Sequence, residues 1–137
     1  SAAPVKTYGV ADLADTRLVR SSLKADGATF TVATEDDEAN FHINQTGQFN
    51  VYNAMAAITV ARSYDISDEL IQKGFLNLKS VPGRMQFITE GQPFSVVIDH
   101  AHTVDALYKL FAELKKLGYE VHFSGLGTGY DTTIITW

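Results

Sequence analysis

The sequence predicts a mixed α+β and α/β fold in three parts: a β-hairpin-rich N-terminal part, a helical pair and a partial βαβ lobe. Three observations predict it. Apolar and polar residues alternate over residues 28–34, as in a half-buried strand. Apolar residues then recur at helical spacing over residues 49–60. Finally, the apolar run at residues 94–98 precedes a polar cluster and a second amphipathic stretch, which is the strand-then-helix order of an α/β unit.

The bulk composition bounds the class of protein. With 137 residues, of which 45% are hydrophobic and 20% are charged, the chain is long enough for one domain or two small lobes. The net charge of −5 argues against a general nucleic-acid or membrane-surface binder. No apolar stretch is long enough to span a bilayer, and the absence of cysteine excludes disulfides and thiolate metal sites. We therefore expect a cytoplasmic protein.

The N-terminal part, residues 5–48, is expected to form β structure with turns. Asp26-Gly27 is a turn signal directly before the alternating strand. Asp36-Asp37-Glu38 marks the solvated tip of a hairpin, and residues 41–43 form its return strand. Successive strands joined in this way predict antiparallel pairing.

Two helices follow. The first covers the helical pattern at residues 49–60, and Asp65-Ile66-Ser67 closes it and opens the second. Ser67 is the expected N-cap of the second helix, with Asp68 and Glu69 in its first turn, where negative charge is favourable. The expected buried face of this helix consists of Leu70, Ile71, Gly74, Phe75 and Leu78.

The best internal boundary is Ser80-Val81-Pro82-Gly83, which interrupts the helical pattern. After it we expect a strand within residues 84–98, a helix over residues 104–117 with Thr103 as its N-cap, and a strand over residues 119–124. This order predicts a βαβ-like unit with parallel strands and a right-handed crossover.

Polar residues on either side of residues 94–98 carry the strongest chemical signal. Arg84 follows a Pro-Gly turn, where a guanidinium suits bidentate phosphate contacts, although a surface arginine in a linker is the plainer interpretation. Asp99 and His102 stand where the strand gives way to a helix N-terminus, with its free N–H groups and partial positive charge. Asp99 can accept from ribose hydroxyls or from a metal's water, and His102 can donate to phosphate. Alternatively, Asp99 and Thr103 only cap the helix.

Asn50 and Asn53 lie one helical turn apart at a helix start. Asn50 can serve simply as the N-cap. Asn53 offers an outward amide, whose donor and acceptor match an adenine edge.

Two other patterns carry weaker signals. His100 and His102 are two apart on an extended segment and point to opposite faces, so zinc is the weaker alternative. The Gly-rich loop at residues 125–129 lacks the GxxxxGK[ST] form of a phosphate-binding loop.

Three phrases, in their order and spacing, resemble the Mur ligase superfamily. They are GQFNVYNAMAA at residues 47–57, VPGRMQ at residues 81–86 and IDHAHTVDAL at residues 98–107. The sequence is most similar to the UDP-N-acetylmuramoyl-tripeptide synthetases, over about residues 5–125. The resemblance implies that residues 1–82 are the C-terminal portion of a central ATPase domain. It implies that residues 83–137 are the N-terminal portion of a truncated C-terminal domain.

Members of that superfamily join an amino acid to a carboxylate of a peptidoglycan precursor, a UDP-MurNAc-peptide, through an acyl phosphate made with ATP and magnesium. The resemblance implies that Asn53, with Asn50, faces the adenine and that Arg84 contacts ATP. It implies that Asp99 holds the ribose or adenine end and that His102 lies near the phosphates. It assigns no catalytic residue and no metal ligand to these positions.

Several departures separate the parent enzyme from this chain. His100 and Val104 replace the usual Tyr and Pro of the superfamily, and Tyr130 occupies the position of an Arg that binds the substrate in other members. The P-loop and the magnesium ligands of the superfamily are not among these residues. We therefore expect a fragment that supplies the adenine and ribose side of an ATP site and is inactive alone.

The alternative is a free-standing, degenerate Mur-like module that binds a nucleotide or a protein without catalysis. For these residues alone, the expected partners are a weakly bound nucleotide and a second copy, held through exposed apolar surface. The precursor and the amino acid are expected only in the full enzyme, and no nucleic acid or membrane is expected.

Overall fold

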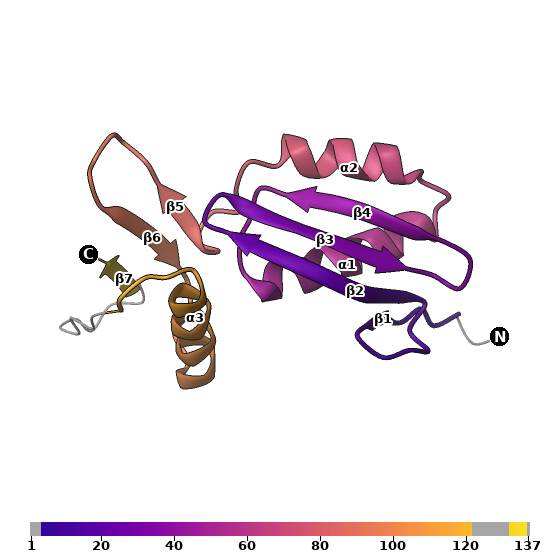
Figure 1. Ribbon diagram of the computed structural model, residues 1–137, viewed down its shortest axis with the longest axis horizontal. Helices are drawn as coiled ribbons and strands as arrows, with labels where there is room; N and C mark the ends of the chain where they lie inside the picture. The colour runs from indigo at the N-terminus through magenta and orange to yellow at the C-terminus, as the bar shows by residue number, and fades with distance from the viewer. Residues whose placement is uncertain (1–3, 122–131, 137) are drawn as a thin grey trace. The chain divides into compact units, whose positions relative to one another are not determined.

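The computed structural model describes residues 4–121 and 132–136. The chain divides into two compact units, Ser1–Lys79 and Ser80–Trp137, and each unit has a sheet of its own (Figure 1). Both units also contain helices, so the predicted mixed α/β class is confirmed.

The sheet of the first unit has the strand order β1-β2-β3-β4. Its strands are β1 (Tyr8–Gly9), β2 (Thr16–Lys24), β3 (Gly27–Ala33) and β4 (Glu38–Ile43). The last three pair antiparallel through hairpins, as the turn signals predict, whereas the short β1 runs parallel to β2. The predicted hairpin-rich N-terminal part is therefore confirmed.

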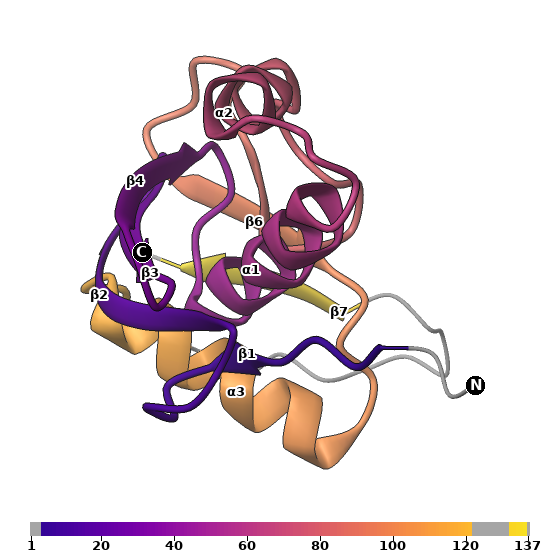
Figure 2. The same cartoon turned by 90° about the vertical axis from the view of Figure 1, so that its right-hand side faces the viewer.

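Two helices, α1 (Gln48–Arg62) and α2 (Asp68–Asn77), lie on the same side of this sheet (Figure 2). The core forms between them and the sheet. Its buried members are Ala28, Phe30, Val32, Phe41, Ile43, Val51, Ala54, Met55, Ile58 and Ile71. Phe41 stacks on Phe30 with 6.0 Å between ring centroids and meets Phe75 edge-on at the same distance. Burial of this apolar surface is the main stabilising term of the unit.

The second helix starts where the sequence predicts, but only part of its predicted buried face is buried. The side chain of Ser67 accepts from the Leu70 N–H, which confirms the predicted N-cap. Of the predicted buried face, Ile71 is buried and Phe75 is partly buried, but Leu70 is 58% exposed and Leu78 is 46% exposed. Leu70 was wrongly assigned because it is one residue from Ile71, about 100° around the helix.

A side chain of α2 also forms hydrogen bonds with main-chain groups on the outer edge of β4. The amide of Gln72 accepts the His42 N–H at 2.8 Å and donates to the His42 carbonyl at 3.0 Å. Because β4 is the last strand of its sheet, these two main-chain groups have no strand partner on that side.

The second unit has a three-stranded sheet in the order β5-β6-β7. Its elements are β5 (Gln86–Ile88), β6 (Ser95–Asp99), α3 (Val104–Lys116) and β7 (Thr132–Thr136). The side chain of Thr103 accepts from the Ala106 N–H, so the predicted N-cap of α3 is confirmed. The order strand, helix, strand is present, but β6 pairs antiparallel with both neighbours, so the expected parallel pairing is wrong.

Two further corrections concern strand boundaries in this unit. The single strand expected within residues 84–98 is a hairpin, because Gln92 closes a turn by accepting the Glu90 N–H and donating to the Ile88 carbonyl. The strand expected over residues 119–124 does not form at residues 119–121, and residues 122–124 lie outside the described residues. Gly118 and Tyr119 instead cap α3, because their N–H groups bond to the carbonyls of Lys115 and Leu114.

Candidate functional site

The segment from Val81 to Met85 forms a tight turn that displays Arg84. The Arg84 N–H bonds to the Val81 carbonyl at 3.1 Å, and Gly83 has a φ of 70°. Proline and glycine at the two central positions, with positive φ at the second, are the signature of a type II turn. The Arg84 side chain is exposed and makes no ion pair with any described residue.

This turn is bonded to the end of β6. The His100 N–H donates to the Gly83 carbonyl at 2.9 Å, and the Met85 N–H donates to Asp99 Oδ2 at 2.8 Å. The His100 ring also lies directly against Gly83, since a Cβ built there would come within 2.1 Å of the ring. The structure therefore brings Arg84 and Asp99, predicted separately from the sequence, onto two bonded segments.

The Asp99 carboxylate is buried, with a relative exposure of 8%. Its second oxygen, Oδ1, accepts the Ala101 N–H at 2.8 Å. Both oxygens therefore accept main-chain N–H groups: Oδ2 from Met85 in the turn, and Oδ1 from Ala101 just after β6. The predicted alternative in which Asp99 caps α3 does not match these bonds, because the cap of α3 is Thr103.

His102 lies just before the start of α3 and is exposed. Its Nδ1 is 2.9 Å from the His100 carbonyl oxygen. Because a carbonyl oxygen only accepts, Nδ1 carries the proton, and Nε2 meets a ligand as an acceptor in the neutral ring or as a donor in the cationic ring. The first N–H groups of α3 are close by in the sequence, and they attract negative charge.

In the first unit, Asn50 and Asn53 are joined to each other. Asn50 is buried and donates to the Thr46 carbonyl at 2.7 Å, while its Oδ1 accepts from the exposed Asn53 at 3.4 Å. The N-cap of α1 is Gly47, so the expectation that Asn50 is the cap is wrong. Asn50 lies three residues into the helix, where its side chain reaches back to the preceding turn.

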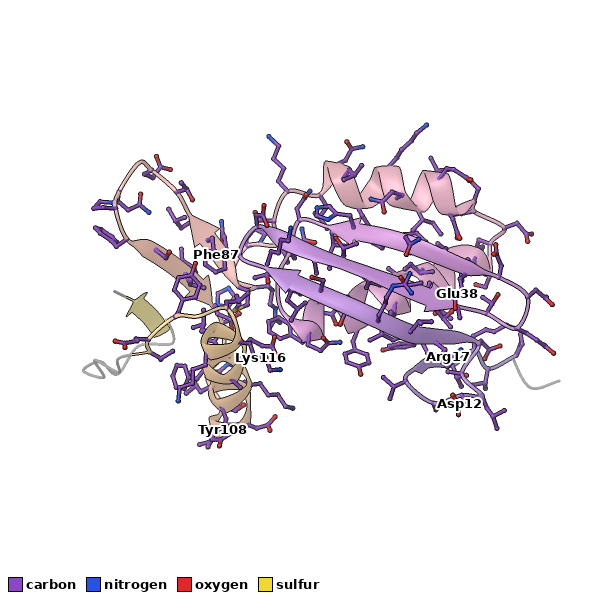
Figure 3. All side chains as sticks on the ribbon, viewed as in Figure 1. Asp12, Arg17, Glu38, Phe87, Tyr108 and Lys116 are labelled. Atoms are coloured by element: carbon purple, nitrogen blue, oxygen red, sulfur yellow. The ribbon has the colours of Figure 1, made fainter. Side chains whose placement is uncertain are left out.

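The first unit also contains a polar cavity of about 750 Å³, lined by segments around β1, β2, the β3–β4 turn and the end of α1. Asp12 and Arg17, labelled in Figure 3, lie at its wall, 4.0 Å apart. On the same wall, hydrogen bonds from Lys6 and then from Thr7 hold the pKa of Asp15 well below its usual range. None of the predicted site residues lines this cavity.

No group of three or more His, Cys, Asp or Glu residues that could hold a metal occurs in the described part of the chain. Likewise, over the described ranges no helix has the length and apolarity needed to cross a membrane.

Sequence reasoning missed two features of this site. One is the positive φ of Met85, 45°, which no residue pattern signals. The other is the contact between the His100 ring and Gly83. The Pro-Gly pair was the available signal for the turn, but the partner of the turn lies 14 residues further along the chain.

Comparison with known proteins gives consistent matches. The Mur ligase middle domain family matches residues 1–61. A UDP-N-acetylmuramoyl-L-alanyl-D-glutamate--2,6-diaminopimelate ligase from Geobacillus kaustophilus is 31% identical over 131 residues, covering 96% of this chain and 27% of the relative. A UDP-N-acetylmuramyl-tripeptide synthetase from a Roseiflexus species is 40% identical over 120 residues, covering 85% of this chain and 24% of the relative.

A solved structure shares the fold. The crystal structure of MurF from Acinetobacter baumannii superimposes with a TM-score of 0.71 at 22% identity, covering 83% of this chain and 25% of that one. The homologues of the chain are Mur ligases, and its residues 1–61 match the middle domain of that family. It spans about a quarter of the length of the curated relatives it matches.

Proposed function

We propose that the chain supplies contacts to the adenine and ribose side of ATP in a ligase that joins an amino acid to a peptidoglycan precursor. The similarity to Mur ligases supports the reaction class, and the names of the relatives refer to ligation of muramoyl peptides. The parent enzyme would use ATP and a UDP-MurNAc-peptide, and it would work in the cytoplasm, where ATP is available.

The display of Arg84 carries this proposal. A guanidinium that projects from a fixed turn, with no carboxylate partner among the described residues, is suited to a phosphate or another anion. In the same unit, His102 presents Nε2 beside the start of α3. Together they offer a fork of donors, a ring nitrogen that donates to an anion when the ring is cationic, and the positive end of the α3 dipole.

The first unit contributes a second kind of contact. Asn53 is exposed and bonded to the buried Asn50, so its remaining donor and its carbonyl oxygen are available to an adenine edge. In this proposal Asn53, supported by the buried Asn50, is the contact to adenine that the first unit offers. Arg84, Asp99 and His102 are the nucleotide contacts that the second unit offers.

These 137 residues by themselves are proposed to bind nucleotide without ligase turnover. Phosphoryl transfer depends on positioned phosphates and metal, and the GxxxxGK[ST] pattern of a phosphate-binding loop does not occur in this sequence. Measurement of ATP-dependent phosphate release, with precursor and candidate amino acids, tests this point. Turnover above background would contradict it.

Titration calorimetry of ATP against the full chain tests the proposed site. Replacing Arg84 with alanine should weaken ATP binding roughly 10- to 100-fold, because hydrogen bonds to charged groups contribute about 1.5–3 kcal/mol. Arg20→Ala is the matched control, since Arg20 is also exposed and unpaired among the described residues but lies on β2 of the first unit. Equal affinities for the unmodified chain and Arg84→Ala would refute the proposal.

A second copy of the chain is the proposed protein partner. Val104 is 86% exposed and Tyr108 is 77% exposed, one turn apart on α3. Tyr108 is labelled in Figure 3. Exposed apolar surface of this kind favours association. Size-exclusion chromatography with light scattering should show a dimer that Tyr108→Glu dissociates; a monomer at all concentrations would refute this part of the proposal.

A further inference from the structure

The polar cavity of the first unit, about 750 Å³ in volume, has the size of a small-molecule site. Its wall includes Thr59, Arg62 and Ser63 at the C-terminal end of α1. Asn50 and Asn53 lie in the first turns of the same helix. At a rise of about 1.5 Å per residue they are about 14–18 Å from Arg62 along the helix. The cavity is therefore separate from the proposed adenine contact.

Two of the cations on the wall are already neutralised within the unit. Asp15 accepts from Lys6 Nζ at 2.9 Å and from the N–H and hydroxyl groups of Thr7, each at 2.8 Å. Arg62 donates to both oxygens of Asp68, at 2.9 and 2.7 Å. These ion pairs fix the wall of the cavity, and their charges are balanced without a ligand.

The remaining charged side chains on the wall lack a close partner. Arg17 Nη1 is 4.0 Å from Asp12 Oδ1, which is beyond hydrogen-bond distance, and the Asp12 side chain is 96% exposed. Glu35 and Asp36 are exposed and make no hydrogen bond or ion pair with any described residue. Charges of both signs thus line the cavity without being neutralised.

The strand register sets how far apart these opposite charges lie. Arg17 on β2 pairs with Ala33 on β3, and Glu35 and Asp36 follow Ala33 in the β3–β4 turn. Paired strands are about 5 Å apart, and two or three residues add about 7–10 Å along the chain, so the main chains at the two charges are roughly 8–11 Å apart. An extended peptide of two or three residues separates its terminal charges by about 7–11 Å. An α-amino acid, by contrast, carries both charges on one carbon.

We propose that this cavity binds a short peptide with free ends, with the peptide carboxylate at Arg17 and the peptide ammonium at Glu35 or Asp36. A guanidinium binds a carboxylate through two parallel N–H bonds, and an ammonium group offers three donors to carboxylates. An anion alone would leave the two acidic side chains unmatched, and a cation alone would leave Arg17 unmatched. The inference goes beyond the proposed function and does not rest on it.

Titration of the full chain with triglycine, followed by NMR of the backbone amides, tests the site. Triglycine should bind saturably and shift the amide signals of Thr16, Thr34 and Ser63, which line the cavity. N-acetyl-triglycine lacks the ammonium group and triglycinamide lacks the carboxylate. Each should bind at least about tenfold more weakly, because a charge-assisted hydrogen bond is lost. Absence of saturable shifts, or equal affinity for triglycine and either blocked form, would overturn the proposal.

Substitutions on the wall assign each end of the peptide. Arg17→Gln should weaken triglycine about tenfold and leave triglycinamide unaffected, because that ligand has no carboxylate. Glu35→Gln combined with Asp36→Asn should weaken triglycine and leave N-acetyl-triglycine unaffected. The matched controls are Arg20→Gln and Glu38→Gln, exposed residues of β2 and β4 that do not line the cavity. Equal weakening of triglycine and triglycinamide by Arg17→Gln would overturn the assignment and with it the proposal.

Competition with ATP separates this site from the proposed nucleotide contacts. Triglycine affinity should be the same with and without ATP, because the two sites are at opposite ends of α1. Displacement of triglycine by ATP would place the peptide at the nucleotide contacts and overturn the proposal. If the chain binds no ATP, the proposed function fails, and the triglycine titration and its variants still decide the peptide site.

Discussion

Replacing Gly83 with alanine should destabilise the second unit more than the same change at Gly91. Both glycines have positive φ, 70° and 82° respectively, so both substitutions strain the backbone similarly. They differ in their surroundings. An added Cβ at Gly83 would meet the His100 ring at 2.1 Å, whereas at Gly91 nothing lies within 4 Å.

The magnitude follows from these two contributions. A left-handed conformation costs a residue with a Cβ about 1 kcal/mol, and this should be the whole effect at Gly91. At Gly83 the His100 ring must also move. Because His100 is exposed, it can swing into solvent, and the lost contact and local shift should add only about 1 kcal/mol. We therefore expect about 2 kcal/mol for Gly83→Ala.

Urea denaturation followed by far-UV circular dichroism measures both values. The double variant Gly83→Ala with His100→Ala isolates the steric part, because it removes the ring that the new methyl group meets. Relative to His100→Ala alone, its cost should fall to that of Gly91→Ala. Equal costs for the two glycine substitutions, or an excess at Gly83 that survives removal of His100, would refute the reasoning.

Three further predictions concern caps and ion pairs. Thr103→Ala should cost about 1 kcal/mol in the free energy of unfolding, because the Ala106 N–H loses its cap; no change would argue against the cap. Asp68→Ala should cost about 1–2 kcal/mol in urea melts, because Arg62 binds Asp68 through two nitrogens at 2.9 and 2.7 Å. The exposed Lys109–Asp105 pair is the control, and Asp105→Ala should cost less than about 0.5 kcal/mol. The lowered pKa of Asp15 means that its contribution is present above the unfolded pKa, near 3.9, and is lost as the pH falls through the folded value. Unfolding between pH 5 and pH 2 should therefore depend less on pH in Asp15→Asn; identical pH profiles would contradict this.

Local signals in the sequence predicted local structure well. Ser67 and Thr103 are N-caps as expected, because a side-chain oxygen before a helical pattern satisfies main-chain N–H groups that nothing else nearby can reach. The Asp26-Gly27 turn likewise separates β2 from β3. In each case the interaction that decides the structure spans only a few residues.

Pairing across the chain was harder to predict. The order strand, helix, strand suggested parallel pairing, yet β6 lies between two antiparallel neighbours. The pairing with β5 follows from the turn that Gln92 closes directly after β5. At the site, the residue type of Arg84 pointed to phosphate binding, and that of Asp99 to ribose hydroxyls or a metal's water. The bond that links them, from the Met85 N–H to Asp99, could not be predicted. It depends on a main-chain donor and on the left-handed φ of Met85, and no residue pattern signals either of them.

The pairing of Gln72 with His42 bears on how the protein behaves at high concentration. An outer strand invites a strand from another molecule to extend the sheet, and such extension leads to aggregates. Near the C-terminal end of β4, however, the N–H and carbonyl groups of His42 on the outer edge are already bonded to a side chain of the same unit. A foreign strand would have to displace that amide and the helix that carries it. The glutamine thus helps to keep the sheet from growing beyond a single molecule.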